Sequence, residues 1–299
     1  MEDYLVRIIA KDAGVRAIAC ITTDLVNEMA TRNETSETAT AVIGEAITGG
    51  ALLGSLLKIK HRVAAKFDGD GPVGKVVVES DAYGKVRGYL ENSAVNTLRD
   101  EAPIDPYGVQ EALGEGVLHV SRDMRLPELV QSYTPLKQGV TDTLDYYLNQ
   151  SEQVKSLIQV GTVLGEDGLV VAAGGILLQN LGDSKANTLA LLQERLAEMP
   201  PIEEQLHNGT MPENILENLF AGIEYIYLEE RPIRFVCTCS RERVEKAIIV
   251  SGEEEIRFLI ADGGATVDCH FCHEQYEFDV DDLEEILEEL LGEDDEDED

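Results

Sequence analysis

The 299-residue chain lacks tryptophan, has five cysteines, and carries 24 Lys and Arg residues against 58 Asp and Glu residues. The formal net charge is −34 and the pI is near 4.3. Most of such a surface repels a nucleic-acid backbone or an anionic membrane, so we predict that the protein binds neither. The 43% hydrophobic content is ample for a packed core, which indicates a globular protein.

The chain also lacks a long uninterrupted apolar run. Its most apolar segment, "TAVIGEAITGGALLGSLL", contains Glu45 and several glycines and has only about the length of the shortest membrane span. We predict a buried helix over about residues 36–58, with Gly50 and Gly54 allowing close packing. The N-terminus has no basic region followed by an apolar run, so we expect no signal peptide and a cytoplasmic protein.

The first half of the chain shows the patterns of a mixed domain. Alternating apolar and polar residues, separated by turn-forming stretches, predict five strands, over residues 4–10, 14–23, 62–69, 72–80 and 84–92. Two more strands are predicted over residues 156–164 and 168–179, the second apolar enough to lie inside the core. A second helix fits residues 141–154. These elements predict an α+β fold class, with an N-terminal mixed sheet and helix domain over residues 1–178.

A glycine-rich segment matches nucleotide-binding motifs only in part. Residues 69–75, "GDGPVGK", match both G-x-G-x-x-G and the first seven places of a phosphate loop. A phosphate loop then needs Ser or Thr, whereas Val76 follows, and both motifs need a helix where "VVVES" favours a strand. We therefore predict a glycine-rich hairpin rather than a nucleotide site.

No catalytic set emerges from the remaining reactive residues. His61, His119 and His207 stand singly, no G-x-S-x-G motif is present, and Cys20 lies in a strand-like run where a small buried side chain is expected. We predict that the protein is not an enzyme.

Residues 179–234 change character and predict a helical linker. Leu189, Leu192 and Leu196 share one helical face, and a second stripe follows at Ile215, Leu216, Leu219, Phe220 and Ile223. Thr210 and Glu213 form a capping-box pattern around Pro212. These short helices either lie permanently on the first domain or form a conditional linker that is released when its docking fails.

Four cysteines form two tight pairs. Cys237 and Cys239 make a C-x-C, and Cys269 and Cys272 make a C-x-x-C, with twenty-nine residues between them. Such pairs let thiolates converge on zinc, and in a reducing compartment they are more often ligands than permanent disulfides. We predict a closed zinc site with these four ligands, and expect His270 and His273 to be neighbours rather than ligands.

The surrounding residues predict a small C-terminal zinc-binding domain over residues 235–291, followed by an acidic disordered tail over residues 292–299. Ser240 can cap a helix through Val244 and Ile248, and a second helix carries Leu283 and Leu287. So few apolar residues make a small core. Zinc binding, worth roughly 10–16 kcal/mol in small metal-folded domains, would then dominate its stability.

Each cysteine pair is also close enough in sequence to form a local disulfide, and the strained C-x-C ring should be easily reduced again. Together with "FDGDGPVGKVVVESDAYGKVRGY", "YYLNQSEQV", "CTCSRERVEKAI" and "VDCHFCHEQYEFD", this pattern resembles the redox-regulated thirty-three-kilodalton heat shock chaperone family of bacteria and plastids. The resemblance covers the whole chain, and the cysteines match at all four places.

The resemblance implies an ATP-independent holdase that is inactive when reduced and zinc-bound. It implies that Cys269 and Cys272 pair first, with zinc release, and that Cys237 and Cys239 pair as the linker unfolds. Exposed linker and core surface then bind unfolding client proteins, with the activated protein a homodimer. The long acidic tail departs from the family pattern.

Two alternatives share the cysteines. A zinc-ribbon nucleic-acid-binding module should show a basic face, but acids outnumber the Arg and Lys residues near the site. A thiol-disulfide oxidoreductase should place one exposed, low-pKa cysteine in a thioredoxin-like βαβ setting.

Overall fold

The computed structural model divides the chain into two compact units, Met1–Val236 and Cys237–Asp299. It describes residues 2–98, 105–182 and 188–296, with side chains up to residue 291. The segment 179–234, which the sequence marks as a linker, belongs to the first unit, whereas all four paired cysteines belong to the second. The acidic tail predicted over residues 292–299 lies outside the described side chains.

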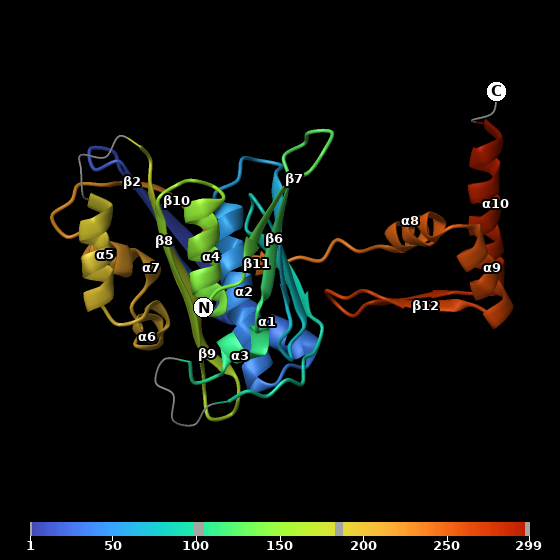
Figure 1. Cartoon of the computed structure of the whole chain (residues 1–299), viewed down its shortest axis with the longest axis horizontal. Helices are drawn as coiled ribbons and strands as arrows, with labels where there is room; N and C mark the ends of the chain where they lie inside the picture. Colours follow the sequence, from blue (N-terminus) through green and yellow to red (C-terminus); the bar gives the residue numbers. More distant parts are fainter. Residues whose placement is uncertain (1, 99–104, 183–187, 297–299) are drawn as a thin grey trace. The chain divides into compact units, whose positions relative to one another are not determined.

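A five-stranded antiparallel sheet forms one layer of the first unit (Figure 1). Its strands, in spatial order, are β10 (Ile226–Pro232), β1 (Tyr4–Ala10), β2 (Val15–Ile21), β9 (Val170–Asn180) and β8 (Ser156–Leu164). β10 pairs with β1 although more than two hundred residues separate them, so the end of the predicted linker is part of this sheet.

A six-stranded sheet forms the other layer. In spatial order it contains β11 (Arg234–Phe235), β5 (Lys85–Leu90), β4 (Lys75–Asp81), β3 (Arg62–Gly69), β6 (Gly116–Asp123) and β7 (Val130–Pro135). All pairs are antiparallel except the two-residue β11, which runs parallel to β5. β3 and β4 are joined by residues 70–74, so the glycine-rich hairpin is confirmed.

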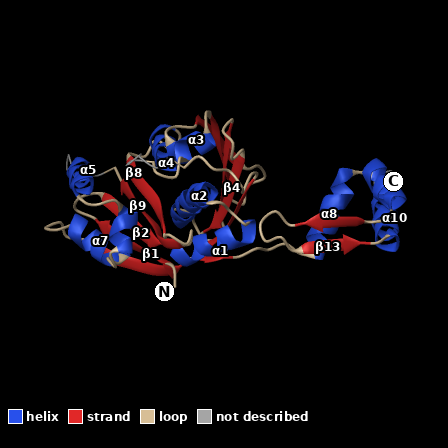
Figure 2. Cartoon of the chain, turned by 90° about the horizontal axis from the view of Figure 1, so that it is seen from below, coloured by secondary structure: helices blue, strands red, loops and turns tan. Residues whose placement is uncertain are grey.

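Helix α2 (Glu37–Ser55) lies between the two sheets and is buried along most of its length (Figure 2). Ser36 caps it by accepting a hydrogen bond from the N–H of Ala39 at 3.3 Å. A Cβ at Gly50 would come within 2.3 Å of Val78, and one at Gly54 within 2.1 Å of Ser80, so the predicted close packing is confirmed. No helix within the described ranges has the length and apolar character needed to cross a membrane.

The first unit contains three further helices around the same core. They are α1 (Thr23–Asn33), α3 (Val109–Leu113) and α4 (Gly139–Gln150). The sequence interpretation found α4 but omitted α1, although Leu25, Val26 and Met29 are buried at helical spacing. It also omitted β6 and β7, whose outward-facing side chains include Val117 and Tyr133 and so blur the alternation.

The predicted linker helices are α5 (Thr188–Glu198), α6 (Ile202–His207) and α7 (Pro212–Leu219). Their apolar residues form one cluster with side chains of β1, β2 and β9, so the helices cover the outer face of the five-stranded sheet. The capping-box prediction is wrong. The N-cap of α7 is Met211, which provides no side-chain cap. The N–H of Thr210 donates to the carbonyl of Gln205 at 2.9 Å, and Glu213 accepts a hydrogen bond from the Tyr4 hydroxyl at 2.8 Å.

The second unit is small. It contains α8 (Arg241–Ser251), α9 (Glu253–Asp262), the antiparallel pair β12 (Ala265–Asp268) and β13 (Gln275–Phe278), and α10 (Val280–Glu296). Among its described side chains, six apolar residues form a buried core, namely Ile248, Ile256, Phe278, Leu283, Ile286 and Leu287. The predicted cap of α8 is confirmed, since Ser240 accepts from the N–H of Arg243.

Candidate metal centre

The four paired cysteines converge at one end of the second unit. Cys237 and Cys239 lie in the extended segment before α8, and Cys269 and Cys272 lie in the turn that joins β12 to β13. This turn is tight: the N–H of His273 donates to the carbonyl of Cys269 at 2.8 Å, and His273 has a φ of 58°. The turn therefore presents two thiols at its tip.

The thiol geometry fits a four-coordinate metal. The four Sγ atoms all lie within 4.8 Å of one another. Cys237 and Cys269 are 3.7 Å apart, and Cys239 and Cys272 are 3.3 Å apart. Tetrahedral zinc with Zn–S bonds of about 2.3 Å requires Sγ–Sγ separations of about 3.8 Å. The residues present could therefore hold a metal ion, and their soft sulfur donors match the ligand set of structural zinc.

The cysteines differ in acidity when no metal is bound. Burial opposes ionisation of Cys237, but the N–H of Cys239 and the neighbouring thiols outweigh it and lower the pKa to about 7. Burial raises the pKa of Cys239 and, much further, that of Cys272. Of these three thiols, Cys237 therefore has the lowest pKa and ionises most readily.

Tyr276 belongs to the site although the sequence interpretation gave it no role. Its hydroxyl donates to Cys239 Sγ at 3.1 Å, and this bond raises the pKa of Tyr276. A second support is Arg241 on α8, which donates to the carbonyl of Glu277, pairs with Asp282 at 2.6 Å and stacks on the ring of Phe278 at 4.3 Å from its centroid. These contacts join α8 to α10 and to β13, the strand that follows the cysteine turn. Only the position of Tyr276 four residues beyond Cys272 could have suggested its role.

Neither histidine beside the second pair enters the metal group of the described residues, which consists of the four cysteines. Both are exposed side chains. Cys20 is also separate, in the core of the first unit, where complete burial raises its pKa to about 12. The prediction that Cys20 acts as a small buried side chain is confirmed.

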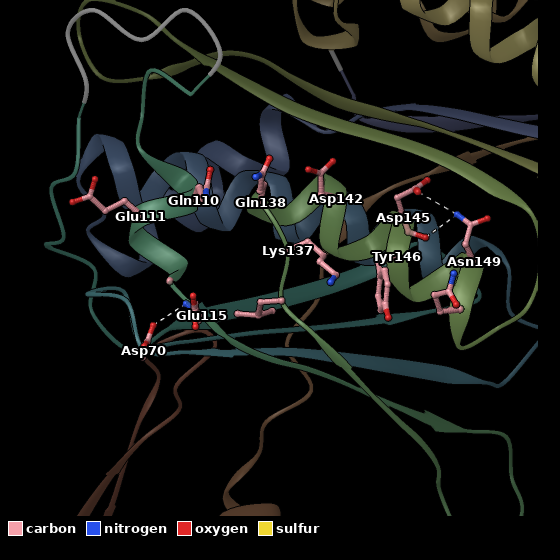
Figure 3. Close-up of a pocket in the computed structure, with 13 residues that line it drawn as sticks. Asp70, Gln110, Glu111, Glu115, Lys137, Gln138, Asp142, Asp145, Tyr146 and Asn149 are labelled. Atoms are coloured by element: carbon pink, nitrogen blue, oxygen red, sulfur yellow. Dashed lines mark hydrogen bonds between the residues drawn. The ribbon is translucent and has the colours of Figure 1, made fainter.

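The residues next to the glycine-rich hairpin do not suit a nucleotide. A hollow of about 1030 Å³ beside Asp70 is lined by five carboxylates and one lysine, Lys137 (Figure 3). Asp70 itself accepts a hydrogen bond from the N–H of Glu115 at 2.7 Å, and Lys137 lies 4.2 Å from the ring of Tyr146. Phosphates would meet negative charge here, which supports the hairpin interpretation.

Comparison with known proteins extends this picture. The family model described as "Hsp33 protein" matches residues 3–279. A protein of Geobacter sulfurreducens named "33 kDa chaperonin" is 44% identical over 298 residues, covering 98% of this chain and 97% of its own. A protein of the same name from Geobacillus kaustophilus is 39% identical over 290 residues, covering 96% and 98%.

A solved structure is similar throughout. The crystal structure of the 33 kDa chaperonin, or heat shock protein 33 homolog, of Thermotoga maritima has a TM-score of 0.87 and 30% identity to this chain. The match covers 97% of this chain and 99% of that one. The α+β fold with its cysteine centre is therefore that of a molecular chaperone. The chain belongs to the Hsp33 family.

Proposed function

We propose that this chaperone is a redox-regulated, ATP-independent holdase. The reduced, zinc-bound form is inactive, and oxidation of the cysteines releases zinc, undocks the segment 179–234 and exposes surface that binds unfolding proteins. One observation carries the proposal: four thiols within 4.8 Å of one another sit in a unit with six buried apolar residues. Such a unit has little else to keep it folded once its thiols are lost as ligands.

In the reduced state, Cys237, Cys239, Cys269 and Cys272 hold the zinc ion. The ion keeps its ligands as thiolates and stabilises the small unit. Because four thiolates close the coordination shell, the site has no open position for a substrate. This supports a structural and regulatory role, in line with a protein that is not an enzyme.

The redox step needs an oxidant such as peroxide. One thiolate of the pair Cys269 and Cys272 attacks the O–O bond, which forms a sulfenic acid and releases one oxygen as water after proton uptake. The other thiol attacks that sulfur, forms the S–S bond and releases the second oxygen as water. Two sulfurs are oxidised and the peroxide is reduced. A second peroxide pairs Cys237 with Cys239 in the same way, as the resemblance to the family implies.

Undocking would expose a large apolar surface. Leu192 and Leu196 on α5, and Leu216, Leu219 and the adjacent Phe220 at α7, are each at most 6% exposed. Leu189, the remaining residue of the predicted stripe, is partly buried in the same cluster. Helices of six to eleven residues such as α5, α6 and α7 are marginal without packing partners, so release and unfolding go together.

The partners of the activated form are unfolding client proteins, held by a homodimer in the cytoplasm. The charge of −34 would keep such a complex soluble and supports the exclusion of nucleic acid and membrane surfaces.

The test compares aggregation of a heat-denatured enzyme in the presence of reduced zinc-loaded protein, peroxide-treated protein and re-reduced, zinc-restored protein, all without nucleotide. We expect suppression in the second sample alone, together with release of about one zinc per chain. Cys20→Ala is the matched control, since it removes a cysteine outside the centre and should leave the switch intact. Equal suppression by reduced and oxidised protein would refute the switch, and catalytic insulin reduction would favour an oxidoreductase instead.

A further inference from the structure

A hollow in the first unit has a charge opposite to that of the chain. Its volume is about 750 Å³, and its lining comes from β2, β6, α4, the segment after α2, the turn between α4 and β8, and the end of β9 with the two residues that follow it. The charged residues of the lining are Arg16, Arg122, Lys155 and Glu152. Three cations against one carboxylate is a marked local excess in a chain with 58 acids and 24 basic residues. We call this hollow the basic pocket.

Arg16 has no acidic partner among the described residues, since no carboxylate there lies within 4.0 Å of its guanidinium. On β2 it lies opposite Gln179 of β9, and its Nη2 donates to the side-chain oxygen of Gln179 at 2.5 Å. Its Nε is buried and has no hydrogen-bond acceptor. Burial and the nearby Arg7 lower the pKa of Arg16, which means that the folded protein destabilises its charged form.

Arg122 on β6 is the second cation. Its Nη1 pairs with Glu152 at 2.6 Å, but its Nε is also buried without an acceptor. Glu152 already accepts a hydrogen bond from the hydroxyl of Tyr147 at 2.5 Å. The one carboxylate of the basic pocket is thus engaged by two donors and does not serve Arg16.

Leucines form the apolar part of the lining, beside the polar side chains of Gln153, Gln179 and Asn180. Leu56, Leu57 and Leu148 contribute to it, and Leu181 is 44% exposed. The turn that supplies Glu152 and Lys155 passes through left-handed backbone at Gln153, where φ is 56°. Non-glycine residues in this conformation cost energy and concentrate at ligand sites.

We propose that the basic pocket binds a small amphipathic organic anion, with its acidic group on Arg16 and Arg122 and its apolar part against the leucines. Arginine binds carboxylate, sulfonate and phosphate groups through N–H donors, and the one carboxylate of the basic pocket, Glu152, is already engaged by Arg122 and Tyr147. Lys155, which is exposed, would attract the anion electrostatically. This inference does not depend on the proposed redox switch.

The experiment uses full-length, reduced, zinc-loaded protein and the probe 1-anilinonaphthalene-8-sulfonate, titrated by fluorescence and calorimetry. Its uncharged analogue N-phenyl-1-naphthylamine is the ligand control. Arg16→Gln and Lys155→Gln are the test variants. Arg125→Gln is the matched protein control, since it makes the same change at an exposed arginine outside the pocket.

We expect one dominant sulfonate site, weakened about tenfold by Arg16→Gln and a few-fold by Lys155→Gln, with Arg125→Gln unchanged. Binding of the uncharged analogue should not respond to Arg16→Gln. The proposal fails if Arg125→Gln weakens binding as much as the pocket variants, which would indicate surface charge alone. It fails equally if neither pocket variant weakens binding. Should Arg16→Gln not fold, Lys155→Gln decides, because an exposed lysine can be changed without loss of the core.

Discussion

Glu45 gives a stability prediction whose sign depends on pH. It is a partly buried acid in the middle of α2, the helix between the two sheets. Burial, then the negative charges of Glu203 and Asp105, raise its pKa to about 8, from an ordinary value near 4.5. The folded chain therefore favours the protonated acid, whereas the unfolded chain ionises at lower pH. Glu45 costs nothing below about pH 4.5, costs progressively more up to pH 8, and costs a constant amount above it.

The magnitude follows from the shift. At pH 7 the pH lies about 2.5 units above the ordinary pKa of Glu45, and the folded chain still keeps the acid protonated. One unit corresponds to about 1.4 kcal/mol, so the cost of Glu45 to the free energy of unfolding is at most about 3 kcal/mol. Because the side chain keeps some contact with water, we expect about 2 kcal/mol. Glu45→Gln should therefore stabilise the first unit by about that much at pH 7, by more at pH 8, and by less than about 1 kcal/mol at pH 5.

The assay is urea unfolding of the reduced, zinc-loaded chain between pH 5 and 8.5, followed by near-ultraviolet signals of tyrosine. Of the ten tyrosines, all except Tyr276 lie in the first unit, so the signal reports that unit. Glu37→Gln is the matched control: this exposed acid in the first turn of α2 favours the helix dipole, and its loss should cost about 0.3–1 kcal/mol. A gain from Glu45→Gln that is independent of pH, or a loss throughout, would refute the reasoning.

Two further substitutions test how the linker helices pack on the five-stranded sheet and how stable the second unit is. A Cβ at Gly161 of β8 would come within 2.2 Å of Glu203 on α6, so Gly161→Ala should weaken the packing of α6 on the sheet. We expect faster proteolysis of residues 188–220 in the reduced protein and a lower oxidant concentration for activity. Adding Glu203→Ala should reverse both effects, and unchanged proteolysis would contradict the prediction. Ser240→Ala removes the cap of α8 and should cost about 0.5–1 kcal/mol, seen as faster zinc loss to a chelator. Ser251→Ala, at the other end of α8, should leave zinc retention nearly unchanged, and equal effects would argue against the cap.

Local patterns were sufficient wherever a feature depends on neighbouring residues. The spacing of Cys237, Cys239, Cys269 and Cys272 is enough to predict a shared centre, because each pair needs only a short turn to present two thiols. The apolar run of α2 and the alternation in β1 and β3 likewise specify their own backbone conformation. The Ser240 cap is equally local.

Tertiary structure decided which surfaces meet. The stripe on α5 and α7 shows that a face is buried but not that β1, β2 and β9 bury it, since these strands lie far away in the sequence. Strand β10 depends on pairing with β1, and Tyr276 reaches Cys239 only because β13 folds back on β12. Arg16 and Arg122 line one hollow although they belong to different sheets. Periodicity indicates which face of a helix or strand is buried. Which segment covers that face depends on the packing of segments that are distant in the sequence, because alternative packings of the whole unit compete in free energy.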